Sequence, residues 1–95
     1  MNLTLKGKNA LVLGSTKGIG FGIAKALLDQ GARVGIVGRI RSDAEKIART
    51  LSSAAGGFGC DTSNSEQIDK LFEGFCSKFG PPNILVLNGG GPPPG

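Results

Sequence analysis

The most informative stretch of the chain is Gly14-Ser15-Thr16-Lys17-Gly18-Ile19-Gly20. It follows the apolar run NALVL at residues 9–13 and opens a segment, 18–30, in which apolar residues recur at helical spacing. A run that is apolar at successive positions is typical of a strand buried on both faces of a parallel sheet. A glycine-rich turn between such a strand and a helix predicts a binding site for the phosphates of a nucleotide, because the amino end of the helix offers unpaired N–H groups and a partial positive charge.

Each glycine of this turn has a distinct expected role. Gly14 lets the chain leave the strand sharply, Gly18 leaves room for a pyrophosphate to approach the backbone, and Gly20 allows the helix to pack closely on the sheet. The alternative interpretation is a turn that is glycine-rich for structural reasons alone. A P-loop is excluded, because no stretch of the chain fits G-x-x-x-x-G-K-[ST].

The rest of the chain continues the alternation of strands and helices. Further buried strands are predicted at 33–37, 56–60 and 84–87, although the glycines of 56–60 weaken that prediction. Ser42 and Glu45 form a capping-box pattern for a second helix, and residues 62–65 supply several N-cap candidates for a third that ends before Gly80. The core-facing residues expected on the three helices are Ile19, Ile23, Ala26 and Leu27; Ala44, Ile47, Ala48 and Leu51; and Ile68, Leu71, Phe72, Phe75 and Phe79.

The order β-α-β-α-β-α-β predicts an α/β fold with a doubly wound parallel sheet. Right-handed crossovers place the first two helices on one face. If the fourth strand lies on the other side of the first, the strand order is 3-2-1-4 and the third helix covers the opposite face. This arrangement is the first half of a dinucleotide-binding domain, occupying residues 1–95 as one partial domain.

The end of the second strand bears on which dinucleotide would bind. An acidic residue at this position is typical of NAD-binding folds, because it accepts a hydrogen bond from the ribose 2′-hydroxyl. This chain has Arg39 there, with Lys17 in the glycine-rich turn as a second cation. Since a guanidinium pairs with a phosphate whereas a carboxylate repels it, the sequence favours NADP(H) over NAD(H). The alternative is that Arg39 and Arg41 are solvated loop charges.

Polar residues also follow the third and fourth strands, at the same edge of the predicted sheet. Asp61, followed by Thr62, could accept a hydrogen bond from the adenine amino group or could cap the next helix, and the spacing does not separate these roles. Asn88, Gly89 and Gly90 end the fourth strand at the switch point of the sheet, where exposed backbone could line the ribose. The alternative for these last residues is a plain turn.

Composition excludes several other classes of protein. The net charge of +4 is scattered rather than gathered into a basic stripe, which argues against a nucleic-acid partner. No apolar run approaches the about 18 residues that span a bilayer, so no membrane partner is expected. The chain has no His, so no zinc or other metal site is predicted. The two cysteines, Cys60 and Cys76, are expected as buried thiols in a reducing, cytoplasmic protein.

With these motifs in place, the sequence resembles the short-chain dehydrogenase/reductase family. Residues 5–20, LKGKNALVLGSTKGIG, are similar to the family's opening, whose fingerprint is T-G-x-x-x-G-I-G, with Leu13 where Thr is usual. The pair Asp61-Thr62 resembles the family's adenine-contacting pair, and Leu87-Asn88-Gly89-Gly90 stands in the place of its N-N-A-G, matching at Asn88 and Gly90. The continuation GGPPPG looks like a subset described as 3-oxoacyl-(acyl carrier protein) reductase-like.

The resemblance implies a Rossmann-like fold and an oxidoreductase that transfers a hydride between NADP(H) and a small carbonyl or alcohol substrate. The family's catalytic Ser and Tyr-x-x-x-Lys lie beyond the fourth strand, and this chain contains no Tyr, so no catalytic residue is assigned. We expect a truncated reading of a longer protein, inactive by itself, whose full-length form is a homo-oligomer. An isolated half-domain should also expose an apolar face. The competing hypotheses are a non-catalytic nucleotide-binding module and a protein-interaction fragment.

Overall fold

The structure of the chain is a computed structural model that describes residues 4–88. Strands and helices alternate along these residues. Their bounds are β1 (Asn9–Leu13), α1 (Gly18–Asp29), β2 (Arg33–Gly38), α2 (Arg41–Leu51), β3 (Ala55–Gly59), α3 (Ser65–Phe79) and β4 (Ile84–Leu87). The predicted elements are therefore confirmed, with ends shifted by a residue or so at α1, β2, α2 and β3.

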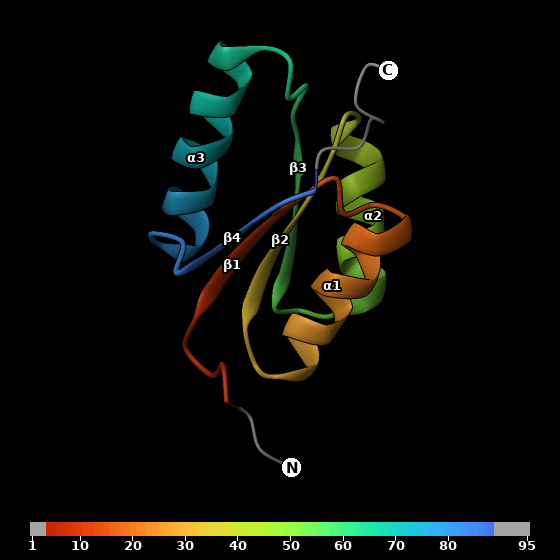
Figure 1. Cartoon of the computed structure of the whole chain (residues 1–95), viewed down its shortest axis with the longest axis vertical. Coiled ribbons are helices and arrows are strands. Elements are labelled where there is room, and N and C mark those ends of the chain that lie inside the picture. The colour runs from red at the N-terminus through yellow and green to blue at the C-terminus, as the bar shows by residue number, and fades with distance from the viewer. Residues whose placement is uncertain (1–3, 89–95) are drawn as a thin grey trace.

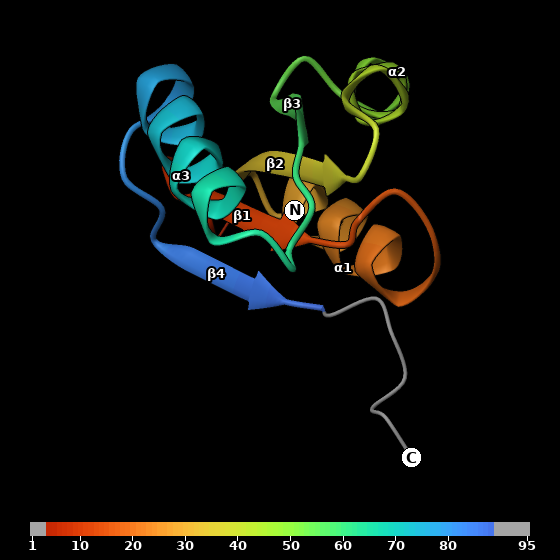
Figure 2. The same ribbon diagram turned by 90° about the horizontal axis from the view of Figure 1, so that it is seen from above.

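The four strands form one parallel sheet in the order β3-β2-β1-β4, which confirms the predicted topology. Leu11 at the centre of β1 is in register with Gly35 on one side and Leu85 on the other. Helices α1 and α2 cover one face and α3 covers the other (Figures 1 and 2). All four strands consequently point their carboxyl ends toward the same edge of the sheet.

The face under α1 and α2 is packed with small residues from the helices. Val12, Val34 and Ile36 of the sheet meet Ala24 of α1 and Ala44 of α2. Alanines let the helix axes approach the sheet closely. The predicted inward face of α2 is confirmed, whereas that of α1 needs a correction.

The correction concerns two residues of α1. Ile19 is 77% exposed and Ala26 is exposed, while Gly20 and Ala24 are buried. Gly20 and Ala24 are four residues apart and share the helix face that meets the sheet, and Ile19 lies outside the core. Ile23 and Leu27 do pack against the core, as expected.

The face under α3 is aromatic. Phe75 is fully buried, and a Cβ on Gly35 would lie 2.9 Å from its ring, so the ring sits directly on the glycine of β2. Phe79 is 5.2 Å from Phe75 between ring centroids, and Phe58 of β3 is 6.0 Å from it. All five predicted core residues of α3 belong to this cluster, as the sequence predicts.

Two local expectations were wrong. The capping box is not formed, because α2 begins at Arg41 with Ile40 as N-cap, and Glu45 instead pairs with Arg41 at 3.1 Å. Cys76 is exposed, since it follows Phe75 and points away from the sheet, whereas Cys60 is buried as expected.

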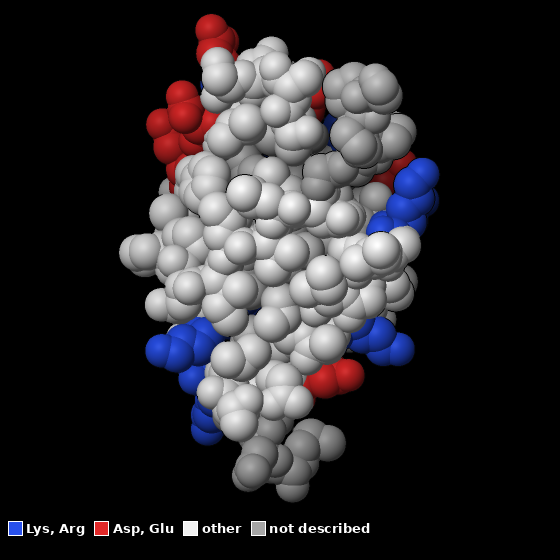
Figure 3. All heavy atoms as spheres, in the orientation of Figure 1, with Lys and Arg blue, Asp and Glu red and all other residues white. Residues whose placement is uncertain are grey.

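The fourth strand is only half covered, contrary to the expectation of a strand buried on both faces. Ile84 and Val86 pack toward α1, but Leu85 is 45% and Leu87 73% exposed on the opposite face. The α3 cluster draws its strand residues from β1, β2 and β3 among the described residues, so α3 leaves that face of β4 uncovered. Viewed from this side, the middle of the molecule lacks charged side chains, which lie around its rim (Figure 3).

Candidate dinucleotide site

A groove of about 880 Å³ lies where the parallel strands end. Its walls come from the β1–α1 turn and from the residues that follow β2, β3 and β4. The lining residues are Gly14, Thr16, Lys17, Gly18, Ile19, Val37, Gly38, Arg39, Cys60, Asp61, Thr62, Ser63 and Asn88. The groove thus brings together nine of the thirteen site residues that the sequence predicts.

The glycine-rich turn has a backbone that side chains would disturb. Gly14 and Gly18 both have φ of 65°, a region that L-residues rarely occupy. A Cβ on Gly14 would lie 2.5 Å from the Asn88 carbonyl oxygen, and one on Gly20 would overlap the Gly14 carbonyl. The start of α1 is therefore drawn tightly against the end of β1, which is the role predicted for Gly20.

The amino end of α1 is open to an anion. No side chain caps it within the described residues, because the N-cap residue is Lys17, which carries no acceptor, and the first turn has no acidic side chain. By contrast, the N-cap of α3, Asn64, accepts from the backbone N–H groups of Glu66 and Gln67. The first-turn N–H groups of α1 and the exposed Lys17 thus suit the diphosphate of a dinucleotide, and the geometry fits that group.

Ser15 lies beneath the groove rather than in its lining. Its side chain is fully buried, and its Oγ donates to the Val12 carbonyl at 2.7 Å and accepts from the Val37 N–H at 2.8 Å. The Ser15 N–H also donates to the Val37 carbonyl at 3.0 Å. Ser15 therefore joins the turn to β2 and shapes the loop, with its hydroxyl already committed.

Arg39 follows β2 and lines the groove. Its side chain is exposed, and the preceding Gly38 lies against the side chain of Thr16, since a Cβ there would be 2.5 Å from the Thr16 Cγ2. The glycine lets the turn and the end of β2 come together. Lys17 and Arg39 therefore border one groove, which no acidic side chain of the β2–α2 connection enters.

Asp61 stands at the end of β3 in a tight turn of its own. Its Oδ1 accepts from the Ser63 N–H at 3.0 Å and the Ser63 hydroxyl at 2.7 Å, and these bonds, with the nearby Arg39 guanidinium, hold the pKa of the Asp61 carboxyl below its usual range. Since Asn64 caps α3, the alternative in which Asp61 is that cap is wrong. Asp61 lines the groove, and its Oδ2 atom makes no hydrogen bond within residues 4–88.

Asn88 ties the end of β4 to the glycine-rich turn. Its Nδ2 donates to the Gly14 carbonyl at 3.0 Å, so a side-chain hydrogen bond joins β4 to the turn after β1 at the switch point of the sheet. Gly89 and Gly90, which the sequence predicts as further lining residues, lie outside the described residues.

Four lining residues were not predicted from the sequence as site residues: Val37, Gly38, Cys60 and Ser63. Gly38 and Cys60 each lie at the carboxyl end of a predicted strand, next to a predicted site residue. This position was the sequence feature that could have identified them as lining residues. Burial, and then the neighbouring Asp61 carboxylate, raise the pKa of the Cys60 thiol. Cys60 thus presents a neutral thiol to the groove at physiological pH.

Comparison with known proteins agrees with this geometry. The family model for short chain dehydrogenases matches residues 8–95. The chain belongs to the short-chain dehydrogenase family. No helix within residues 4–88 of this family member has the length and apolarity needed to cross a membrane.

The chain is similar to individual members of the family. It is 45% identical over 89 residues to a D-beta-hydroxybutyrate dehydrogenase of Cupriavidus necator, covering 90% of this chain and 34% of that protein. It is 35% identical over 88 residues to a 3-oxoacyl-[acyl-carrier-protein] reductase of Vibrio cholerae, covering 93% of this chain and 36% of the relative.

A solved structure shows the same fold. It is the 3-ketoacyl-(acyl-carrier-protein) reductase from Brucella melitensis complexed with NADH, which is similar with a TM-score of 0.81 and 39% identity over 86% of this chain and 34% of that one. This short-chain dehydrogenase family member therefore spans about one third of the length of the relatives it matches.

Proposed function

We propose that these residues form the adenine and diphosphate half of an NADP(H) site in an oxidoreductase that transfers a hydride between the coenzyme and a small carbonyl or alcohol. The nicotinamide coenzyme supplies the hydride when it is bound. The N–H groups at the start of α1 would bind the diphosphate, and Asn88 would keep the turn in shape. Asp61 is the proposed acceptor for the adenine amino group.

The proposal of NADP(H) rather than NAD(H) rests on the position of Arg39. The Brucella relative is described with NADH, so family membership supports a nicotinamide dinucleotide in general. Arg39, at the end of β2, occupies the position at which an acidic residue would repel a 2′-phosphate. Its guanidinium, with Lys17 in the same groove, supports the phosphorylated coenzyme.

The test is to measure the affinity of the chain for NADPH and NADH, in the unaltered protein and in Arg39→Ala. Loss of a charge-assisted pair with the 2′-phosphate should weaken NADPH binding by about tenfold or more and leave NADH binding nearly unchanged. Arg41→Ala is the matched control, because Arg41 pairs with Glu45 and lines a different groove. Equal or tighter NADH binding, or an unchanged preference in Arg39→Ala, would contradict the proposal.

The proposed catalytic machinery lies outside these residues, and we expect the 95-residue chain to bind coenzyme without turning over substrate. We further propose a cytoplasmic enzyme that is a homo-oligomer in its full-length form. Reading the gene beyond codon 95 tests the enzyme against a binding module. A Ser followed by Tyr-x-x-x-Lys supports the enzyme, whereas a stop with retained NADPH binding supports a non-catalytic module, and absence of nucleotide binding supports an interaction fragment.

A further inference from the structure

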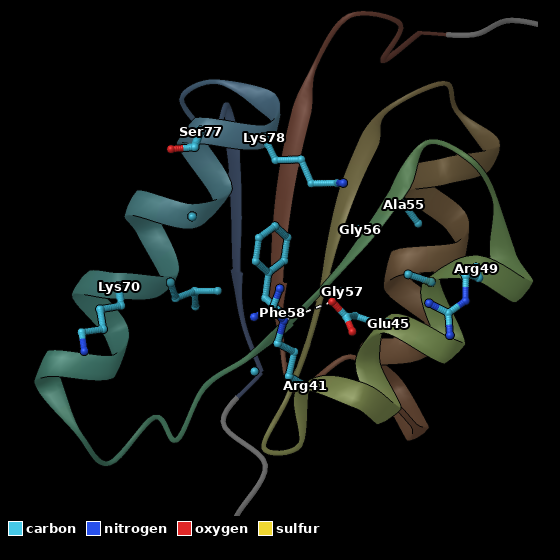
Figure 4. A pocket seen from close by; sticks show the side chains of 14 residues that line it. Arg41, Glu45, Arg49, Ala55, Gly56, Gly57, Phe58, Lys70, Ser77 and Lys78 are labelled. Atoms are coloured by element: carbon cyan, nitrogen blue, oxygen red, sulfur yellow. Dashed lines mark hydrogen bonds and ion pairs between the residues drawn. The ribbon is translucent and has the colours of Figure 1, made fainter.

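A second groove, of about 660 Å³, runs along the outer side of β3 between α2 and α3. This second groove is separate from the first, which we propose for the coenzyme and call the coenzyme groove. None of the residues assigned to the dinucleotide lines the second groove. Figure 4 shows the strand between its two walls, with Arg41, Glu45 and Arg49 on the α2 wall and Lys70, Ser77 and Lys78 on the α3 wall.

The floor of this groove is an unpaired strand edge. Strand β3 pairs with β2 alone among the described strands, and the doubly wound order adds further strands beyond β4, so β3 remains at the border of the sheet. The Val34 N–H donates to the Ala54 carbonyl at 3.0 Å and the Cys60 N–H donates to the Gly38 carbonyl at 2.8 Å. Residues 54, 56, 58 and 60 therefore face β2, because backbone groups alternate along a strand.

The same alternation turns the backbone N–H and C=O groups of Gly57 and Gly59 outward, into the groove. Gly59 is exposed and Gly57 is half-buried. A Cβ on Gly57 would overlap the Glu45 backbone, so α2 lies close against one face of the strand and forms a wall. Two consecutive outward-facing positions without side chains leave the edge open to another extended chain.

The walls of the groove are basic. Four cations and one carboxylate line it, and the carboxylate, Glu45, is already paired with Arg41 at 3.1 Å. Lys78 is folded over the strand: its Cε would lie 2.7 Å from a Cβ on Gly56, and its Nζ is 5.8 Å from the centre of the Phe79 ring. In Figure 4 the Lys78 side chain points from α3 toward the strand, and Arg49 lies on the α2 side.

We propose that this basic groove binds an extended acidic segment of a partner protein, which adds to the sheet as a strand beside β3. Backbone groups of Gly57 and Gly59 would pair with the segment, and carboxylates on its two faces would meet Lys78 and Arg49. A second copy of this chain is a poor occupant, because its own β3 edge carries the same cations and the two would repel each other.

The test uses a short fluorescent peptide of glutamate and valine with carboxylates on both faces of the extended chain, and measures its binding by fluorescence anisotropy. The double variant Arg49→Gln/Lys78→Gln should weaken binding by about tenfold, since two charge pairs are lost. The matched control is Lys25→Gln/Lys46→Gln, which removes the same charge from positions outside the groove and should leave binding within about twofold.

A second peptide separates strand addition from simple attraction of opposite charges. N-methylation at alternate backbone positions keeps every carboxylate but removes the hydrogen bonds, and it should reduce affinity at least about tenfold. Bound peptide should also slow hydrogen exchange at the Gly57 and Gly59 amides, a readout that needs no variant. The proposal is overturned by absence of peptide binding, by equal losses in both double variants, by equal binding of the N-methylated peptide, or by unchanged exchange at the two glycines. Circular dichroism of each variant verifies the fold, and NADPH affinity is a separate measurement on a separate groove.

Discussion

The two cysteines show how one residue type acquires two chemical characters from its position. Cys60 closes β3, is 2% exposed, and has a pKa raised above its usual value of 9.0 by burial and by the Asp61 carboxylate. Cys76 lies on the outer side of α3. Because the thiolate is the reactive species, both burial and a raised pKa slow the alkylation of Cys60.

Iodoacetamide at neutral pH should therefore modify Cys76 first, with Cys60 slower by about tenfold or more. Single variants Cys60→Ser and Cys76→Ser, followed by mass spectrometry, assign the two rates. Saturating NADPH should slow the alkylation of Cys60 further and leave that of Cys76 unchanged, because Cys60, unlike Cys76, lines the groove that we propose for the coenzyme. Equal alkylation rates for the two thiols would contradict the described burial.

At the same scale, the sequence predicted most of the residues that line the groove, but it did not assign a separate role to each of them. The positions of Arg39, Asp61 and Asn88 follow from the rule that parallel strands end at one edge. The hydrogen bond that the Ser15 hydroxyl accepts comes from the Val37 N–H, which lies on another strand. Such a contact depends on tertiary packing, and a local pattern does not contain it.

The first residues of α2 and α3 show what determines where a helix begins. Asn64 is the N-cap of α3, with its Oδ1 3.0 Å from the Glu66 N and 3.2 Å from the Gln67 N. Ser42, which a capping-box pattern predicts as a cap, lies one residue inside α2. The helix begins at Arg41, so Ser42 is already a helical residue and cannot be the N-cap, and Glu45 pairs with Arg41.

Asn64→Ala should lower the free energy of unfolding by about 1 kcal/mol, since two N–H groups lose their acceptor. Ser42→Ala, the matched control, should change it by less than about 0.5 kcal/mol, because alanine is favourable inside a helix. Urea unfolding followed by circular dichroism measures both. A larger loss for Ser42→Ala than for Asn64→Ala would show that the cap positions are misplaced.

Strand and helix positions were predictable because apolar periodicity is a local property of the sequence, and all seven elements lie close to where it placed them. The inward face of α1 was less predictable. Gly20 lies against the Gly14 carbonyl, and Ala24, which shares a helix face with Gly20, is buried in place of Ala26. The apolar pattern does not contain this contact across the turn.

For the molecule as a whole, the uncovered face of β4 is the main departure from a closed fold. Leu85 and Leu87 lie beside each other on this face without an apolar neighbour from α3 among the described residues. The sequence alone predicted an exposed apolar face, but it also predicted β4 as buried on both faces. Four successive apolar residues do not distinguish a strand covered on both faces from one covered on a single face.

The 95-residue chain should accordingly self-associate through this face. Burial of a leucine side chain is favourable by about 1.5–3 kcal/mol, so Leu87→Glu should weaken association at least about tenfold in sedimentation velocity. Ile40→Glu is the matched control, because Ile40 is 59% exposed but follows β2 away from this face, and it should leave association unchanged. A monodisperse monomer with a sharp two-state melt in the unaltered chain would contradict the expectation.

The Asn88 amide contacts a carbonyl that lies 74 residues earlier in the chain. During synthesis the glycine-rich turn leaves the ribosome long before its distant partner, and β1 has no β4 beside it until residues 84–87 follow. A nascent chain can therefore form the β1–α1–β2 unit early, while the turn reaches its final geometry only after the last described strand has emerged.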